Sequence, residues 1–110
     1  MTSNAKDWQQ NFIDLVERLA SSPEAQIAYL ENLDVEVDEL ALEFESLHVP
    51  HRLTFTDRQN DYVREIDRLF SEMSNSSDDG LWSFSGLQSD RRWAKVREIA
   101  TLLFSSLTEM

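Results

Sequence analysis

The chain contains no cysteine and only two glycines and two prolines among its 110 residues. Without cysteine there is no disulfide and no thiolate metal site, and nothing implies an oxidising compartment. Tight-turned β architectures place glycine or proline at nearly every connection, so the scarcity of these two residues favours long helices. No apolar run approaches the roughly 20 residues that span a membrane, and no signal-like segment precedes one. We therefore expect a cytoplasmic protein, bacterial or otherwise, with no membrane contact.

Basic residues are also few, since ten Lys and Arg stand against 21 Asp and Glu and give a net charge of -11. Such a charge repels nucleic acid and anionic membrane surfaces, which predicts no direct nucleic-acid binding. The apolar content of 41%, with three Trp and six Phe, is sufficient for a buried core. Residues 1–110 are therefore expected to form a single folded domain.

Two helices are predicted in the first third of the chain. Ser3 or Asn4 can cap a helix ending near Ala20, whose apolar positions share one face. These positions are Trp8, Phe12, Leu15 and Leu19. Ser22, Pro23 and Glu24 form an N-cap, a first-position proline and a first-turn acid. They predict a second helix to about Leu33, with Ile27 and Leu30 facing the core.

The segment from Asp34 to Leu47 fits two patterns. Val37, Leu40 and Phe44 suit a helix, whereas Val35, Val37 and Leu42 belong to a partial alternation. Because Glu, Leu and Ala dominate the segment, we predict a helix over its whole length. Pro50 then disfavours helix at the preceding residue, and 51–55 are expected to be extended.

A helix starting at Thr56 has the clearest pattern. Thr56 and Gln59 match a capping box, and a helical apolar stripe follows: Tyr62, Ile66, Leu69 and Met73. Asp61 with Arg64, and Glu65 with Arg68, are expected to pair on its outer surface. Residues 74–80 form a polar loop with no apolar anchor, which we expect to be mobile, as we do residues 1–3.

The last third of the chain returns to apolar patterning. Leu81, Trp82, Phe84 and Leu87 are expected to lead back to the core through a short helical turn. Ser89 or Asp90 then starts a final helix with one apolar face: Trp93, Val96, Ala100, Leu103 and Leu107. We interpret all three tryptophans as core residues. The predicted fold is all-α, an antiparallel bundle of four to five helices.

Eight acidic residues occur from Glu24 to Glu45. No Lys or Arg occurs anywhere between Arg18 and Arg52 to balance them. One interpretation is a solvated surface that maintains solubility. The other is a surface that steers and holds a basic protein partner. The residues assigned to that partner-binding surface are Glu31, Asp34, Glu36, Asp38, Glu39, Glu43 and Glu45.

Metal and catalytic sites are weakly indicated. Asp34, Glu36, Asp38 and Glu45 match positions 1, 3, 5 and 12 of a calcium loop, but Glu39 occupies the position that requires glycine. His48 and His51 beside Glu43 and Glu45 could ligate zinc or iron, although a proline-containing loop fixes no geometry. No nucleophile elbow or glycine-rich phosphate loop occurs. We therefore expect no enzyme activity, no cofactor and no metal.

A basic cluster starts the last helix, where the macrodipole disfavours cations. Arg91, Arg92 and Lys95 form it, so an acidic group is expected beside them. The acidic segment of the same chain is one candidate, and that of a second copy is the other. In the second case these three residues would mediate self-association as a homodimer.

Three sequence segments resemble those of small uncharacterised bacterial helical proteins, some of them similar to immunity proteins of toxin systems. The segments are Asp38-Glu39-Leu40-Ala41-Leu42-Glu43-Phe44, Leu81-Trp82 and Trp93-x-x-Val96-Arg97-x-x-Ala100. The resemblance covers residues 22–107 in the order of elements. It implies a helical fold, no catalytic residues and a protective binding role.

The sequence therefore predicts a non-enzymatic acidic interaction protein, most concretely an immunity or inhibitor protein that binds a basic protein. The alternative is a self-associating structural or regulatory adaptor. A metal-dependent activity at His48 and His51 is the third hypothesis.

Overall fold

The computed structural model describes residues 5–47, 55–77 and 79–109, and all regular elements within these ranges are helical. They comprise six α-helices and one 3-10 helix, η2. The elements are α1 (Ala5–Ala20), α2 (Pro23–Leu33), α3 (Glu39–Leu47), α4 (Asp57–Ser74), η2 (Asp79–Trp82), α5 (Phe84–Ser89) and α6 (Arg91–Thr108). The predicted all-α class is therefore confirmed for the described residues. None of their helices is long and apolar enough to cross a membrane.

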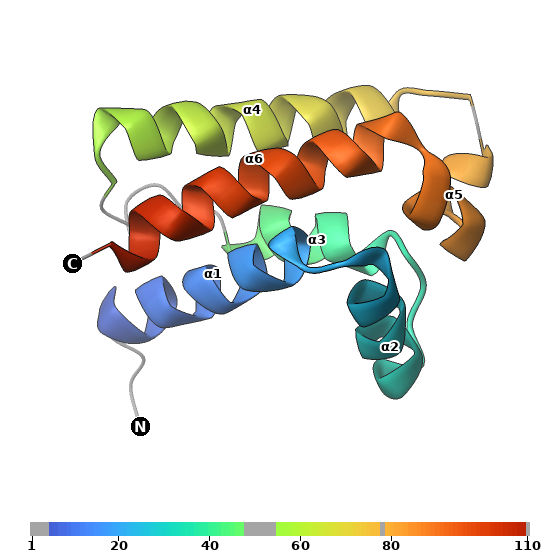
Figure 1. The fold of residues 1–110 in the computed structure, drawn as a ribbon, viewed down its shortest axis with the longest axis horizontal. Coiled ribbons are helices and arrows are strands. Elements are labelled where there is room, and N and C mark those ends of the chain that lie inside the picture. Colours follow the sequence, from blue (N-terminus) through green and yellow to red (C-terminus); the bar gives the residue numbers. More distant parts are fainter. Residues whose placement is uncertain (1–4, 48–54, 78, 110) are drawn as a thin grey trace.

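The three long helices lie side by side, with α6 between α1 and α4 and running in the opposite direction to both (Figure 1). α3 packs against α1, and α2 packs against α1 and α5. The structure shows six α-helices in its described parts, whereas we expected four or five. The difference arises between α4 and α6, where we expected a short helical turn and the structure has η2 followed by a separate α-helix, α5.

Helix starts follow their capping residues. The Ser22 side chain accepts a hydrogen bond from the Ala25 backbone N–H, which caps α2 as predicted. Both hydrogen bonds of the capping box between Thr56 and Gln59 are present at the start of α4. Asp90 caps α6 by accepting from the Arg92 backbone N–H. These caps confirm three predicted boundaries, while Ser3 and Asn4 lie outside the described residues.

The predicted helix from Asp34 is wrong for its first five residues. Asp34 has left-handed backbone angles, φ 56° and ψ 47°, and its N–H bonds back to Leu30 and Glu31 carbonyls. The Val35 N–H also bonds to the Leu30 carbonyl, so α2 closes here and the chain turns. Asp tolerates the left-handed region better than most residues do, which makes this stop possible without glycine. The prediction is confirmed only for residues 39–47, which form α3.

The core combines the predicted stripes with a chain of aromatic rings. Phe12, Leu15 and Leu19 of α1 are fully buried, as are Leu40 of α3 and Trp93 of α6. Neighbouring ring centroids 5.4 to 6.0 Å apart connect Phe55, Phe12, Phe44, Phe70, Trp93 and Trp82 in that order. Contacts at this separation stabilise beyond the area that they bury. This chain of rings connects α1 and α3 with α4, α6 and η2.

Phe84 is the clear exception among the predicted core residues. Its side chain is 38% exposed at the start of α5, whereas Leu81 and Leu87 are buried as predicted. Leu87 of α5 faces the core, whereas Phe84, the first residue of α5, lies at the edge of the core. The side chain of Trp8 lies outside the described residues.

A buried polar network joins α1, α2, α5 and α6. The Gln26 side chain is 1% exposed and donates to the backbone carbonyls of Arg18 and Leu19 at 3.1 Å. Arg97 donates to the Gln26 side-chain oxygen at 3.2 Å and to the Leu87 carbonyl at 2.9 Å. Burial lowers the pKa of the Arg97 guanidinium. At the end of α1, the network thus supplies a donor to the Leu19 carbonyl and a second donor to the Arg18 carbonyl, which also accepts from the Ser21 N–H.

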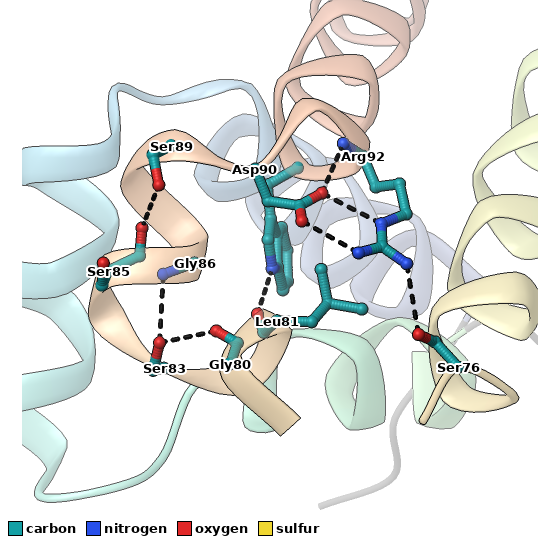
Figure 2. Close-up of polar contacts among 10 residues, drawn as sticks. Ser76, Gly80, Leu81, Ser83, Ser85, Gly86, Ser89, Asp90 and Arg92 are labelled. Carbon is teal, nitrogen blue, oxygen red and sulfur yellow. Dashed lines mark hydrogen bonds and ion pairs between the residues drawn. The ribbon is translucent and has the colours of Figure 1, made fainter. Parts of the chain in front are cut away.

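Close backbone packing fixes the connection between η2 and α5 (Figure 2). A Cβ at Gly86 would lie 2.2 Å from the Gly80 carbonyl oxygen, so only glycine fits there. The Ser83 hydroxyl donates to the Gly80 carbonyl and accepts from the Gly86 N–H. The Trp93 indole N–H donates to the Leu81 carbonyl at 2.9 Å. The connection therefore holds η2 against the start of α6.

The predicted mobile loop is shorter than expected. Ser74 is the last residue of α4, and Asp79 already belongs to η2. Residues 1–3 and 78 of the segments that we expected to be mobile lie outside the described residues, as does most of the expected extended segment 51–55.

Candidate functional site

A groove of about 680 Å³ lies between α3, the second half of α4 and η2. α3 contributes to it because residues 41, 42 and 45, together with Asp38 just before the helix, follow one helical face, while Leu40 faces the core. α4 contributes a second stripe, at positions 67, 70, 71 and 74 with the same helical spacing. The lining residues are Glu36, Asp38, Ala41, Leu42, Phe44, Glu45, Asp67, Phe70, Ser71, Ser74, Asn75 and Trp82.

Apolar side chains form the floor of the groove. Phe44 and Phe70 meet there with ring centroids 5.6 Å apart. Trp82 lies half-buried at the η2 end and is edge-on to the buried Trp93 at 5.8 Å. Leu42 is 52% exposed, the largest exposed fraction of any large apolar residue described. The groove thus combines a rigid aromatic base with an accessible aliphatic side chain.

Acidic side chains form the rim. Glu36, Asp38 and Glu45 come from the α3 side and Asp67 comes from α4, and no Lys or Arg is among the described residues that line the groove. Within the described parts of the chain, these four carboxylates form no salt bridge. Uncompensated carboxylates beside an apolar surface attract and orient a cation that carries apolar groups.

Glu43 has a different role from its neighbours on the rim. Its carboxylate accepts from Arg18 at 2.9 Å and from the Tyr29 hydroxyl at 2.7 Å, and its side chain is 17% exposed. The Arg18 guanidinium also lies over the Tyr29 ring at 4.5 Å. Burial, followed by the hydrogen bond to Glu43, raises the pKa of Tyr29. Glu43 therefore holds α3 to α1 and α2.

The structure divides the seven predicted partner-binding acids. It brings Glu36, Asp38 and Glu45 together at the groove. Glu43 pairs inside the fold, and Glu39 lies on the Glu43 side of α3, where its charge contributes to the raised pKa of Tyr29. The other two, Glu31 and Asp34, are exposed at the end of α2 and do not line the groove.

Sequence reasoning missed Asp67, Phe70 and Trp82 as groove residues. Phe70 follows Leu69 directly and so lies beside the predicted apolar stripe of α4, not on it. A second stripe at the same helical spacing, Asp67, Phe70, Ser71 and Ser74, is visible in the sequence and could have indicated a second partly apolar face.

The basic cluster has an acidic neighbour, and that neighbour is Asp90. Its carboxylate accepts from the Arg92 side chain at 2.9 and 3.0 Å, and Arg92 also donates to Ser76 (Figure 2). The hydrogen bonds from Arg92 lower the pKa of Asp90. Lys95 lies 3.7 Å from Glu98. Within the described residues, the acidic groups paired with this cluster are therefore Asp90 and Glu98, which belong to the N-cap and the body of α6 and not to the acidic segment 24–45.

A second hollow of about 420 Å³ lies over these basic residues. Leu69, Asp90, Arg91, Arg92 and Lys95 line it. The three residues that we predicted to mediate self-association are therefore grouped at one site, with Arg91 and Lys95 exposed.

Among the described residues, no three His, Asp or Glu side chains are arranged to hold a metal ion. The calcium-loop spacing from Asp34 is interrupted by the left-handed turn and the start of α3. His48 and His51, the residues of the third hypothesis of a metal-dependent activity, lie outside the described residues.

Comparison with protein-family models, curated proteins and solved structures finds no match. The segments that resemble immunity-like proteins hold buried residues, among them Leu40, Phe44, Trp93, Val96 and Ala100. A similarity at buried positions reflects the packing of the fold and not a binding surface. The groove and its charges are therefore the features that bear on function.

Proposed function

We propose that this protein is a non-enzymatic interaction protein that binds a basic protein partner in the groove between α3 and α4. The observation that carries the proposal is the composition of the groove: among the described residues that line it, four are acids and none is basic, and they surround an apolar floor with a half-exposed Leu42. An apolar centre with a polar rim is the usual anatomy of a protein interface. An immunity or inhibitor protein acting in the cytoplasm on a basic effector is the most concrete form of this role, within an antiparallel bundle fold.

Charge gives this surface its selectivity. The net charge of -11 steers a basic partner from a distance, and the rim orients it after encounter. Complementary charges raise the association rate and exclude wrong partners more than they raise affinity. Binding should therefore weaken with salt, since the Debye length falls from about 10 Å at 0.1 M to about 3 Å at 1 M.

A pair of charge-reversal variants tests the role of the groove. Glu36→Lys/Glu45→Lys reverses two rim charges, and Glu17→Lys/Glu31→Lys reverses two exposed acids away from it. Each double variant changes the net charge by the same amount, from -11 to -7. Glu45, Glu17 and Glu31 lie near helix C-terminal ends, where Lys is favourable, and Glu36 is exposed in the connection between α2 and α3, so both variants should fold.

Wild-type protein and both variants are then used to isolate partners from host extract, with bound proteins quantified at low and high salt. A basic protein should bind to the wild type and the control but not to the groove variant. The proposal fails if that protein binds all three equally, or if the control loses binding as the groove variant does.

Self-association is the second candidate, because the basic hollow at Arg91 and Lys95 is complementary to the groove of another copy. It has less support, since Arg92 is already paired with Asp90. Light scattering at high concentration and low salt tests it. A strict monomer would eliminate this role.

A further inference from the structure

We infer that the bound segment of the partner is an amphipathic helix with its apolar face on the groove floor and its basic residues toward α3. This inference rests on the proposed function and specifies the partner's recognition element. It follows from the shape of the two walls, the placement of apolar groups and the uneven distribution of charge between the walls.

Both walls are helical stripes of the same length. The α3 wall runs from Asp38, just before the helix, to Glu45, and the α4 wall runs from Asp67 to Ser74; each has eight residues and therefore spans about 10 Å at the rise of an α-helix. α3 makes most of its helix contacts with α1 and meets α4 through Phe44 and Phe70 at the floor, so the two stripes form separate walls above that contact. A third helix placed between two helical walls can pack its ridges against both. About two turns of such a helix would contact the protein.

The apolar positions suit a helix that carries two or three large side chains on one face. Leu42 and Ala41 lie on the α3 wall, Phe70 lies at the base of the α4 wall, and Trp82 closes one end. A helix bound in an apolar groove is read through anchors at i, i+3 or i+4, and i+7. Leu42 is the residue with most area left to bury, which makes it the expected main contact.

The charges are distributed unequally between the walls. The α3 side carries Glu36, Asp38 and Glu45, whereas the α4 side carries only Asp67 beside Ser71, Ser74 and Asn75. Lys or Arg residues should therefore be concentrated on the flank of the ligand helix that faces α3. Neutral polar residues suit the flank that faces α4, where hydroxyl and amide groups can bond to them.

Synthetic peptides test this inference with a defined ligand. The first has about 14 residues, roughly four helical turns, with leucines at i, i+3, i+4 and i+7 and lysines on one flank. The second has the same composition but disperses the leucines around the helix. Their affinities for the protein are measured by fluorescence anisotropy of labelled peptide, and the helicity gained on binding is measured by difference circular dichroism.

Leu42→Ala and Leu102→Ala locate the contact. Leu102, on α6, is 45% exposed and does not line the groove, so it is a matched control for Leu42, which is 52% exposed. Truncating Leu42 should weaken binding of the amphipathic peptide about five- to tenfold, because half of a leucine side chain remains available for burial. Truncating Leu102 should change the affinity less than twofold.

The expected result is binding of the amphipathic peptide, with a gain in helicity, at least tenfold tighter than that of the permuted peptide. Equal binding of the two peptides, no gain in helicity, no binding of either, or equal effects of Leu42→Ala and Leu102→Ala would overturn the helix inference. The proposed function is judged separately by the partner isolated from extract. Loss of that partner in Glu36→Lys/Glu45→Lys alone supports the groove even if both peptides fail.

Discussion

Replacing Gln26 with leucine removes the centre of the polar network between α1, α2, α5 and α6 while keeping a side chain of similar volume. The Leu19 carbonyl loses its side-chain donor, whereas the Arg18 carbonyl keeps a hydrogen bond from the Ser21 N–H. Arg97 loses one of its two acceptors. An unsatisfied buried acceptor costs about 1–3 kcal/mol, and a hydrogen bond to a charged group contributes about 1.5–3 kcal/mol. Because the buried leucine adds apolar burial that offsets part of these two costs, we expect the free energy of unfolding to fall by about 2–4 kcal/mol.

That loss is a large part of the total, since a domain of this size unfolds with about 5–15 kcal/mol. Urea denaturation followed by far-UV circular dichroism measures it. With an m value of about 2 kcal/mol/M, the midpoint should fall by about 1–2 M at unchanged m. Gln88→Leu is the control, because Gln88 is exposed on α5 and should change stability by less than about 0.5 kcal/mol. A Gln26→Leu midpoint equal to that of the control would refute this account of the network.

Three further predictions concern the residues that position the groove. Glu43→Ala should lower the free energy of unfolding by about 1.5–3 kcal/mol, because Arg18 and Tyr29 lose their acceptor. Glu45→Ala, on the exposed rim, should change it by less than about 0.5 kcal/mol. Equal effects of the two variants in urea denaturation would contradict the conclusion that Glu43 is structural and Glu45 is accessible. Gly86→Ala should lower the free energy of unfolding by about 2 kcal/mol or more in the same assay, because the new methyl group would overlap the backbone carbonyls of Gly80 and Leu81. A variant as stable as wild type would show that η2 and α5 are less tightly packed. The lowered pKa of Asp90 means that its carboxylate stabilises the fold above its unfolded pKa of about 3.9, and this stabilisation is lost as pH falls through the folded pKa. The stability difference between wild type and Asp90→Asn should therefore shrink below about pH 4, and a difference independent of pH would count against the pairing with Arg92.

Local signals were enough to predict several boundaries from the sequence. Ser22 with Pro23, and Thr56 with Gln59, act through hydrogen bonds and backbone angles within a few residues, so the starts of α2 and α4 could be predicted. The turn at Asp34 could not, because propensity across 34–47 favours helix and a non-glycine residue in the left-handed region is uncommon.

The groove depends on contacts between distant parts of the chain. Asp67 and Trp82 reach it only because α4 and η2 fold beside α3, and no local pattern places them there. The different environments of Glu43 and Glu45 have the same origin: Arg18 and Tyr29 cover one face of α3, and the opposite face borders the groove. Counting acids along the chain indicated the charged region but could not distinguish its structural from its accessible carboxylates.

The most direct test of the groove is the affinity of the isolated basic partner for three proteins: wild type, Glu36→Lys/Glu45→Lys and the charge-matched control Glu17→Lys/Glu31→Lys. Titration calorimetry at low and high salt should show a loss of about 100-fold for the groove variant, roughly tenfold for each reversed charge. The affinity of the partner for the control should remain within a few-fold of its affinity for wild type. The difference in affinity between wild type and the groove variant should become smaller at high salt, because salt screens the charges of the rim. Equal affinities for the two double variants would contradict binding in the groove.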